Sequence, residues 1–266
     1  MGHAPKDIYE FIEDFVRICN EGLIESHRQG DTGIGKTLED LLGIEENAYQ
    51  APDFADYELK AHRINGGNSM ITLFTKSPDI RGANNRLREE YGYGPAGMKE
   101  LHATLKVGTC TGESQLGLIN DRSAERVYIS SENSEIPYAY YSYDNIFDAL
   151  HSKYAREKAV FVSAANYGPK SNESFQYIQA DLVMGLDNNR FLDLLDDGTI
   201  KFDIRLGHYP DGRSHDHGSG FRLYPRDESK LFSKQVTLYN AITKEKVSYR
   251  DLKQLINDYS KSNGIY

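Results

Sequence analysis

The chain of 266 residues is predicted to have an α/β fold in which a mixed β-sheet is flanked by helices. Three observations predict it: apolar residues at helical spacing near the N-terminus, alternating or wholly apolar runs along the middle, and helical spacing again near the C-terminus. Hydrophobic residues make up 39% of the chain and charged residues 27%, as in an ordinary globular protein. This length allows one large domain or two closely packed lobes.

The first third of the chain is expected to contain two helices and two strands. An amphipathic helix is expected over residues 6 to 28, with a glycine-rich turn after it and a short helix from about Lys36 that stops at Gly43. Strands are expected around residues 57–63 and 69–75. The apolar positions of the first helix are Ile8, Phe11, Ile12, Phe15, Ile18 and Cys19.

The rest of the chain alternates between strands and helices. A tract rich in glycine and proline is expected to form a loop, and apolar runs of alternating or continuous type are expected to form strands. The expected elements are a loop at 92–97, strands within 102–107 and 115–130, a tyrosine-rich stretch at 138–143, a helix over 146–154, a buried strand at 158–163, a helix at 189–196, a strand at 199–206 and a helix at 249–259.

Composition narrows the class of protein. No run approaches the length of a membrane span, and the N-terminus lacks the apolar core of a signal peptide, so a cytoplasmic protein is expected. The two cysteines, Cys19 and Cys110, have no spacing for zinc. The net charge of −9 and the pI near 5.4 argue against a nucleic-acid binder. However, residues 60–106 carry eight Lys and Arg against four Asp and Glu, which permits a DNA-binding groove.

Asp53, Glu58 and Lys60 form the most informative pattern, Pro-Asp followed after four residues by Glu-x-Lys. Within the expected strand, Glu58 and Lys60 point to one face and Leu59 to the other, and Asp53 can join the first face from the preceding turn. Two neighbouring carboxylates can bind a hard cation such as Mg2+, and an ammonium can hold or polarise a water molecule. These groups could hydrolyse a phosphodiester. Taken alone, the pattern also fits a solvated face of an edge strand.

Residues Gly30 to Thr37 match the P-loop pattern Gly-x-x-x-x-Gly-Lys-Thr. A P-loop needs a buried hydrophobic strand before the glycine turn, so that backbone N–H groups cradle phosphates at the N-terminus of the next helix. Residues 25–29 are instead polar and are expected to continue the first helix, and no second acidic strand follows. We therefore expect no nucleotide cofactor, and we expect the glycines to form a turn that can approach DNA closely. An NTP-dependent switch or motor is the alternative.

Glu39 lies fourteen residues before Asp53, on the short helix, where it could meet the strand that carries Glu58. Alone, it also fits a capping or solvent-facing glutamate. The segments Gly-Ile-Gly-Lys-Thr-Leu-Glu, Pro-Asp-Phe and Glu-Leu-Lys together resemble the catalytic region of the MvaI/BcnI restriction endonucleases, and more distantly the mismatch-repair nickase MutH. Three further segments, which include Arg81, Arg205 and the His-Asp-His run, extend the resemblance over about residues 31–224.

The resemblance implies a PD-(D/E)xK restriction-endonuclease-like core with two lobes around a DNA cleft. Residues 1–110 would form the catalytic lobe and residues 111–230 the DNA-recognition lobe, while residues 231–266 form an extension of unassigned role. The resemblance also implies a bacterial or archaeal monomer that binds double-stranded DNA and hydrolyses it with Mg2+ to 5′-phosphate and 3′-hydroxyl ends.

The resemblance assigns roles to four residues. Asp53 and Glu58 would bind Mg2+, Lys60 would orient the attacking water and stabilise the phosphate charge, and Glu39 would help to position the metal site or Lys60. The alternatives are a MutH-like methylation-directed nickase and a DNA-binding module whose catalytic site has decayed.

A second cluster is suited to reading bases. Asp203 and Arg205 share one strand face, and a second strand brings His215, His217 and Arg222 after a loop. A two-stranded ribbon can enter the major groove, where Arg pairs with guanine and Asp accepts from cytosine. This chemistry suits a G·C-containing site, and the resemblance implies a CCNGG-like target. The alternatives are a transition-metal site at His-x-His and a solvated hairpin. The expected DNA contacts are Lys36, Lys76, Arg81, Asp203, Arg205, His215, Asp216, His217 and Arg222.

Overall fold

The chain forms two compact units in a computed structural model. The structure describes residues 3–45, 53–64, 70–110, 112, 114–132, 134–154, 158–209 and 213–262. Unit 1 comprises residues 1–69, 154–186 and 232–266, and unit 2 comprises residues 70–153 and 187–231. The units therefore differ from the consecutive lobes expected from the sequence, because strands from distant parts of the chain pair within each unit.

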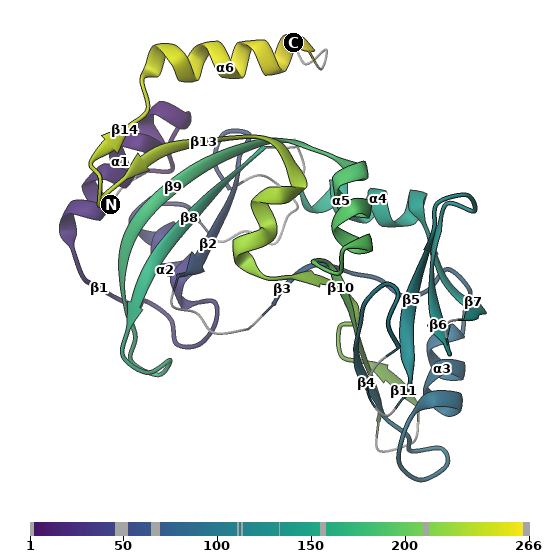
Figure 1. The fold of residues 1–266 in the computed structure, drawn as a ribbon. Helices are drawn as coiled ribbons and strands as arrows, with labels where there is room; N and C mark the ends of the chain where they lie inside the picture. The colour runs from purple at the N-terminus through teal and green to yellow at the C-terminus, as the bar shows by residue number, and fades with distance from the viewer. Residues whose placement is uncertain are drawn as a thin grey trace. The chain divides into compact units, whose positions relative to one another are not determined.

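A mixed six-stranded sheet forms the centre of unit 1 in the described part of the chain. The strand order is β14-β13-β9-β8-β2, with β1 also paired to β9; β2 and β8 are parallel and the other pairs are antiparallel. Figure 1 shows the long strands β8 and β9 curving side by side. The strands are β1 Ile24–Glu25, β2 Glu58–Arg63, β8 Lys158–Tyr167, β9 Ser174–Leu186, β13 Phe232–Asn240 and β14 Glu245–Lys246.

Three helices, α1 (Ile8–Glu21), α2 (Gly33–Leu41) and α6 (Tyr249–Ser262), share one hydrophobic core with the strands of unit 1. The predicted end of the first helix at residue 28 is wrong. Gly22, at a φ of 80°, ends α1, and the following residues pair with β9 instead. None of the described helices is long and apolar enough to cross a membrane.

Unit 2 contains a five-stranded sheet and a three-stranded meander, as far as its residues are described. The larger sheet has the order β11-β10-β12-β3, and β4 pairs with the opposite edge of β10. Rings pack beneath it, with centroids 5.0 Å apart between Phe202 and Phe221 and 5.2 Å apart between Phe74 and Phe221. The elements are β3 Ile71–Thr75, α3 Ala83–Tyr91, β4 Leu101–Leu105, β5 Leu116–Asp121, β6 Arg126–Ser131, β7 Ser134–Ser142, α4 Tyr143–Lys153, α5 Asn188–Asp196, β10 Lys201–His208, β11 Ser214–Asp216, β12 Gly220–Leu223 and η1 Pro225–Leu231.

Candidate functional site

Asp53 precedes β2 in a turn that aromatic rings hold against α1. Phe54 and Tyr57 form an isolated bridge with ring centroids 5.4 Å apart, and Phe54 stacks on Phe11 at 5.1 Å. The Leu59 N–H donates to Asp53 Oδ2 at 2.7 Å, and the Asp53 N–H donates to the Tyr57 carbonyl at 3.1 Å. The Asp53 carboxylate is thereby fixed beside the first residues of β2.

Glu58 and Lys60 stand on the face of β2 that points away from the core of unit 1. Leu59 and Ala61 pack against that core, and strand alternation puts Glu58 and Lys60 on the other side. The Lys60 ammonium donates to Glu58 Oε1, and the two side chains are 23% and 21% exposed. The structure therefore brings one ammonium and one carboxylate together at a position that solvent can reach.

His62 continues this face, two residues after Lys60. The in-register pairing of β2 with β8 places it beside Ser163. Burial lowers the pKa of His62 below its ordinary value, while the charge of Asp181 on β9 acts in the opposite direction. Sequence reasoning did not single out His62, although the alternation from Glu58 onward was a signal for it.

The helix that carries Glu39 and Lys36 packs against β2. Burial raises the pKa of the Tyr177 phenol, and the nearby Glu39 carboxylate adds to that rise. The Lys36 ammonium forms an ion pair with Asp40 at 2.8 Å, so part of its charge is offset within α2. α2 begins at Gly33, a few residues before the predicted start.

The glycine segment before α2 lacks the strand that a P-loop needs. β1 is two residues long and carries one exposed and one half-buried residue, and the predicted helix over 25–29 is absent. The Thr37 hydroxyl donates to the Gly33 carbonyl at 2.8 Å and accepts from the His27 N–H at 2.9 Å. This hydroxyl is thus used in holding the start of α2.

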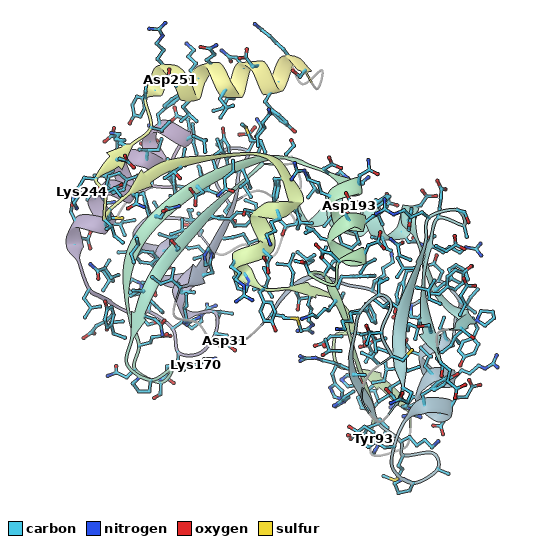
Figure 2. All side chains as sticks on the ribbon, in the orientation of Figure 1. Asp31, Tyr93, Lys170, Asp193, Lys244 and Asp251 are labelled. Carbon is cyan, nitrogen blue, oxygen red and sulfur yellow. The ribbon has the colours of Figure 1, made fainter. Side chains whose placement is uncertain are left out.

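Arg63 ties the same glycine segment to the end of β2. Its guanidinium donates to the carbonyls of Gly30 at 3.0 Å and Asp31 at 2.8 Å, and it forms a bidentate pair with Glu173 at 2.7 and 2.6 Å. The Arg63 and Glu173 side chains are only 11% and 3% exposed. Hydrogen bonds from Arg63 lower the pKa of the Glu173 carboxyl. Asp31 also pairs with Lys170, next to it in Figure 2.

Asp203 is the centre of a charged cluster on β10 in unit 2. Its carboxylate accepts from Arg205 at 2.9 Å and from the Thr104 hydroxyl, and Arg222 Nε forms an ion pair with it at 3.3 Å. The Arg205 side chain is 47% exposed, whereas those of Arg222 and Asp203 are 12% and 8% exposed. Burial and the charge of Arg205 lower the pKa of the Arg222 guanidinium. Arg205 is therefore the group of this cluster most open to a ligand.

His215, His217 and Arg222 do not lie on one second strand. β11 carries His215, β12 carries Arg222, and both pair antiparallel with β10 within the larger sheet, so the single second strand predicted over these residues is split in two. The ring centroids of His215 and His217 are 4.2 Å apart. The predicted loop residues 210–212 lie outside the described residues.

Asp216 shapes the turn that follows β11. Its carboxylate accepts from the N–H groups of Gly218 and Ser219 at 3.0 and 2.7 Å and from Asn84 Nδ2 at 3.1 Å. The Lys76 N–H donates to the Ser219 carbonyl at 3.1 Å, which brings the end of β3 to this turn. Arg81 is exposed just before α3. Sequence reasoning did not foresee the structural bonds of Asp216.

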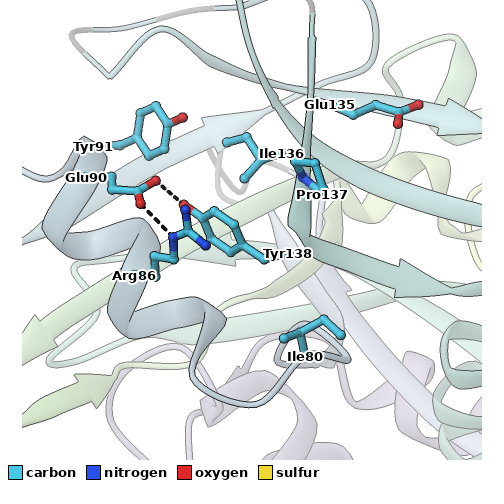
Figure 3. Close-up of a pocket in the computed structure, with 8 residues that line it drawn as sticks. All are labelled: Ile80, Arg86, Glu90, Tyr91, Glu135, Ile136, Pro137 and Tyr138. Atoms are coloured by element: carbon cyan, nitrogen blue, oxygen red, sulfur yellow. Dashed lines mark hydrogen bonds and ion pairs between the residues drawn. The ribbon is translucent and has the colours of Figure 1, made fainter.

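Two further features concern possible ligands. Among the described residues, no group of three or more His, Cys, Asp and Glu side chains is arranged to hold a metal ion. A cavity of about 510 Å³ in unit 2 is lined by residues of α3 and β7 and by Ile80 (Figure 3). In its wall, the Arg86 guanidinium pairs with Glu90 at 2.6 Å and lies 3.9 Å from the ring centroid of Tyr138. None of the predicted site residues lines this cavity.

The comparisons with known proteins point to one family. A sequence model of the MvaI/BcnI restriction endonuclease family matches residues 12–232. A solved complex of the restriction endonuclease MvaI with its cognate DNA substrate is 31% identical; the match covers 85% of this chain and 96% of that chain, with a TM-score of 0.67. The structure of MvaI in the absence of DNA is 30% identical, over 87% and 98% of the two chains, with a TM-score of 0.59. No curated protein sequence matches the chain.

Proposed function

Because the chain belongs to the MvaI/BcnI restriction endonuclease family, and is thus a DNA-cleaving enzyme, we propose that it uses Mg2+ to cut double-stranded DNA at a short CCNGG-like site. The observation that carries the proposal is the group formed by Asp53, Glu58 and Lys60 at the start of β2. A carboxylate fixed by a backbone N–H, a second carboxylate and an ammonium occupy one strand end there.

The donor set fits a hard divalent cation. Asp53 and Glu58 supply carboxylate oxygens, and Mg2+ is usually held by one or two carboxylates together with water and substrate phosphates. When bound, Mg2+ would polarise the scissile phosphate and lower the pKa of a bound water.

The chain's own residues would divide the remaining tasks. Lys60, reachable from solvent beside Glu58, would orient the attacking water and stabilise the charge that builds up on the phosphate. Glu39 would help to position the metal site or Lys60, since α2 packs against β2. The products would be 5′-phosphate and 3′-hydroxyl ends.

Unit 2 would read the sequence. Arg205 presents a half-exposed guanidinium whose orientation Asp203 fixes, which suits a bidentate contact with guanine O6 and N7. Arg222, His215, Asp216 and His217 would complete the reading face. Lys36, Lys76 and Arg81 would contact the DNA as well, and the enzyme would act as a monomer that cuts one strand at a time.

Incubation with plasmid DNA tests this proposal. Four results would support the proposal. Linear fragments form in Mg2+, they do not form when the metal is chelated, ATP does not change the cleavage, and the fragment ends share one short sequence. Degradation without a common sequence, or full activity in excess chelator, would contradict it. Nicks confined to a methylation-dependent strand would favour a MutH-like nickase instead.

A further inference from the structure

A row of four rings crosses the face of β10 that carries Arg205. The ring centroids are 4.5 Å apart between Tyr209 and His215, 4.2 Å between His215 and His217, and 6.4 Å between His217 and His102. His102 and His217 are exposed, and His215 is half-buried. The row therefore runs from the β10–β11 hairpin across β10 to β4.

Strand register fixes His102 on this face. β4 pairs with β10 so that His102 lies opposite Arg205 and Thr104 opposite Asp203. Directly opposed side chains stand on the same side of a sheet. The hydrogen bond from the Thr104 hydroxyl to Asp203 agrees with this orientation. His102 is thus the cross-strand neighbour of Arg205, although the two residues are far apart in the sequence.

Gly207 leaves room for the row. A Cβ at this position would lie 2.8 Å from His217 Nε2, so the His217 ring occupies the space that a side chain on β10 would take. The Gly207 carbonyl accepts from the buried Arg88 of α3 at 3.0 Å, which holds the backbone in place below the ring. The His217 ring can therefore lean across β10 toward His102.

We propose that His102 is a further specificity-determining residue, which donates an imidazole N–H to a guanine edge beside the base pair that Arg205 reads, a role that rests on the proposed function of unit 2. The His102 ring is exposed, makes an edge contact with His217, and has no hydrogen-bond partner among the described residues. A neutral imidazole carries one N–H donor, and guanine presents two acceptors, O6 and N7, in the major groove.

The test is binding of the whole enzyme, in Ca2+ rather than Mg2+, to its target duplex and to duplexes with one base pair changed, at several salt concentrations. His102→Ala should lower discrimination about tenfold at one base pair and leave the salt dependence unchanged, since one hydrogen bond is lost and no phosphate contact. His102→Gln, which keeps an N–H donor, should restore part of that discrimination. His3→Ala removes an exposed histidine of unit 1 and should change nothing.

Two results would overturn the role of His102. One is a uniform loss of affinity for all duplexes with a shallower salt dependence, which indicates a phosphate contact. The other is unchanged discrimination in His102→Ala. Arg205→Ala separates this failure from failure of the proposed function: a selective loss in Arg205→Ala with none in His102→Ala removes only the His102 assignment, whereas no selective loss in either variant removes the reading role of the whole face.

Discussion

Lys60 shares the open face of β2 with Glu58, and the two side chains form an ion pair. We expect Lys60→Met to slow cleavage about 100- to 1,000-fold, the typical effect of losing one charged or polar donor to a transition state. Affinity for the target in Ca2+ should remain. Lys244→Met, in the exposed turn after β13 (Figure 2), serves as the control. Equal cleavage rates for the two variants would contradict the assignment.

Arg205 and Arg222 differ in burial, and their substitutions should differ in effect. We expect Arg205→Ala to cost about 1–3 kcal/mol of discrimination at one base pair, because the proposed bidentate contact with a base is lost. Arg222→Ala should also lower the free energy of unfolding, because Arg222 is only 12% exposed and balances the buried Asp203. Binding of both protein variants to duplexes with one base pair changed measures discrimination, and urea unfolding measures their stability. An equal loss of unfolding free energy in Arg205→Ala and Arg222→Ala would contradict the expected difference.

Arg63, at the end of β2, pairs with Glu173, just before β9, and also holds the glycine segment at Gly30 and Asp31. The contribution of the Arg63–Glu173 pair to stability should depend on pH. Hydrogen bonds from Arg63 lower the pKa of Glu173 from its ordinary value of 4.5. A carboxyl with a lowered folded-state pKa stabilises the fold above the unfolded-state value, and this contribution is lost as the pH falls through the folded-state pKa. Glu173→Gln should therefore be less stable than wild type at pH 7, with a difference that shrinks below pH 4.5. Urea unfolding at several pH values measures it, and a constant difference would contradict it.

Periodicity predicts those elements whose pattern is unbroken. α5, β8 and α6 are confirmed close to their predicted positions, because buried residues recur at helical spacing along the two helices and β8 is an almost continuous buried run. β9 was missed, since its register shifts against β8 near Gln179 and the alternation of buried residues breaks there. β13 was missed because polar residues dominate the first half of the strand.

The candidate sites show the same limit. The turn and strand from Asp53 to Lys60 are local, so a sequence pattern can reveal them. The pairing of Arg63 with Glu173 and the position of His102 beside Arg205 depend on contacts between distant segments. Strand register, which no local pattern fixes, creates the contact of His102 with Arg205, and the Arg63–Glu173 pair joins β2 to the residue before β9.

At the scale of the molecule, each unit is assembled from separate segments, and residues on both sides of the family match, such as Ile8 and Leu238, lie in the core of unit 1. Leu252 of α6 is fully buried there. We expect Leu252→Ala to lower the free energy of unfolding by about 2–5 kcal/mol, as for other large-to-small core changes. Gln254→Ala, on an exposed position of the same helix, should change it by less than about 0.5 kcal/mol. Urea unfolding of both variants measures the difference. An equally small change in the two would show that the packing of α6 does not contribute to the stability of unit 1.

The division of labour between the units is the central claim, and one pair of assays on Asp53→Asn tests it most directly. This variant keeps an acceptor for the Leu59 N–H but removes the carboxylate charge of the proposed metal site. Asp56→Asn serves as the control. It makes the same change at an acidic residue of the same turn, which pairs with Lys158 of β8. We predict that Asp53→Asn binds the target duplex in Ca2+ with wild-type sequence preference and fails to cut it in Mg2+, while Asp56→Asn does both. Cleavage by Asp53→Asn at the wild-type rate, or loss of its sequence preference together with its cleavage, would contradict the account.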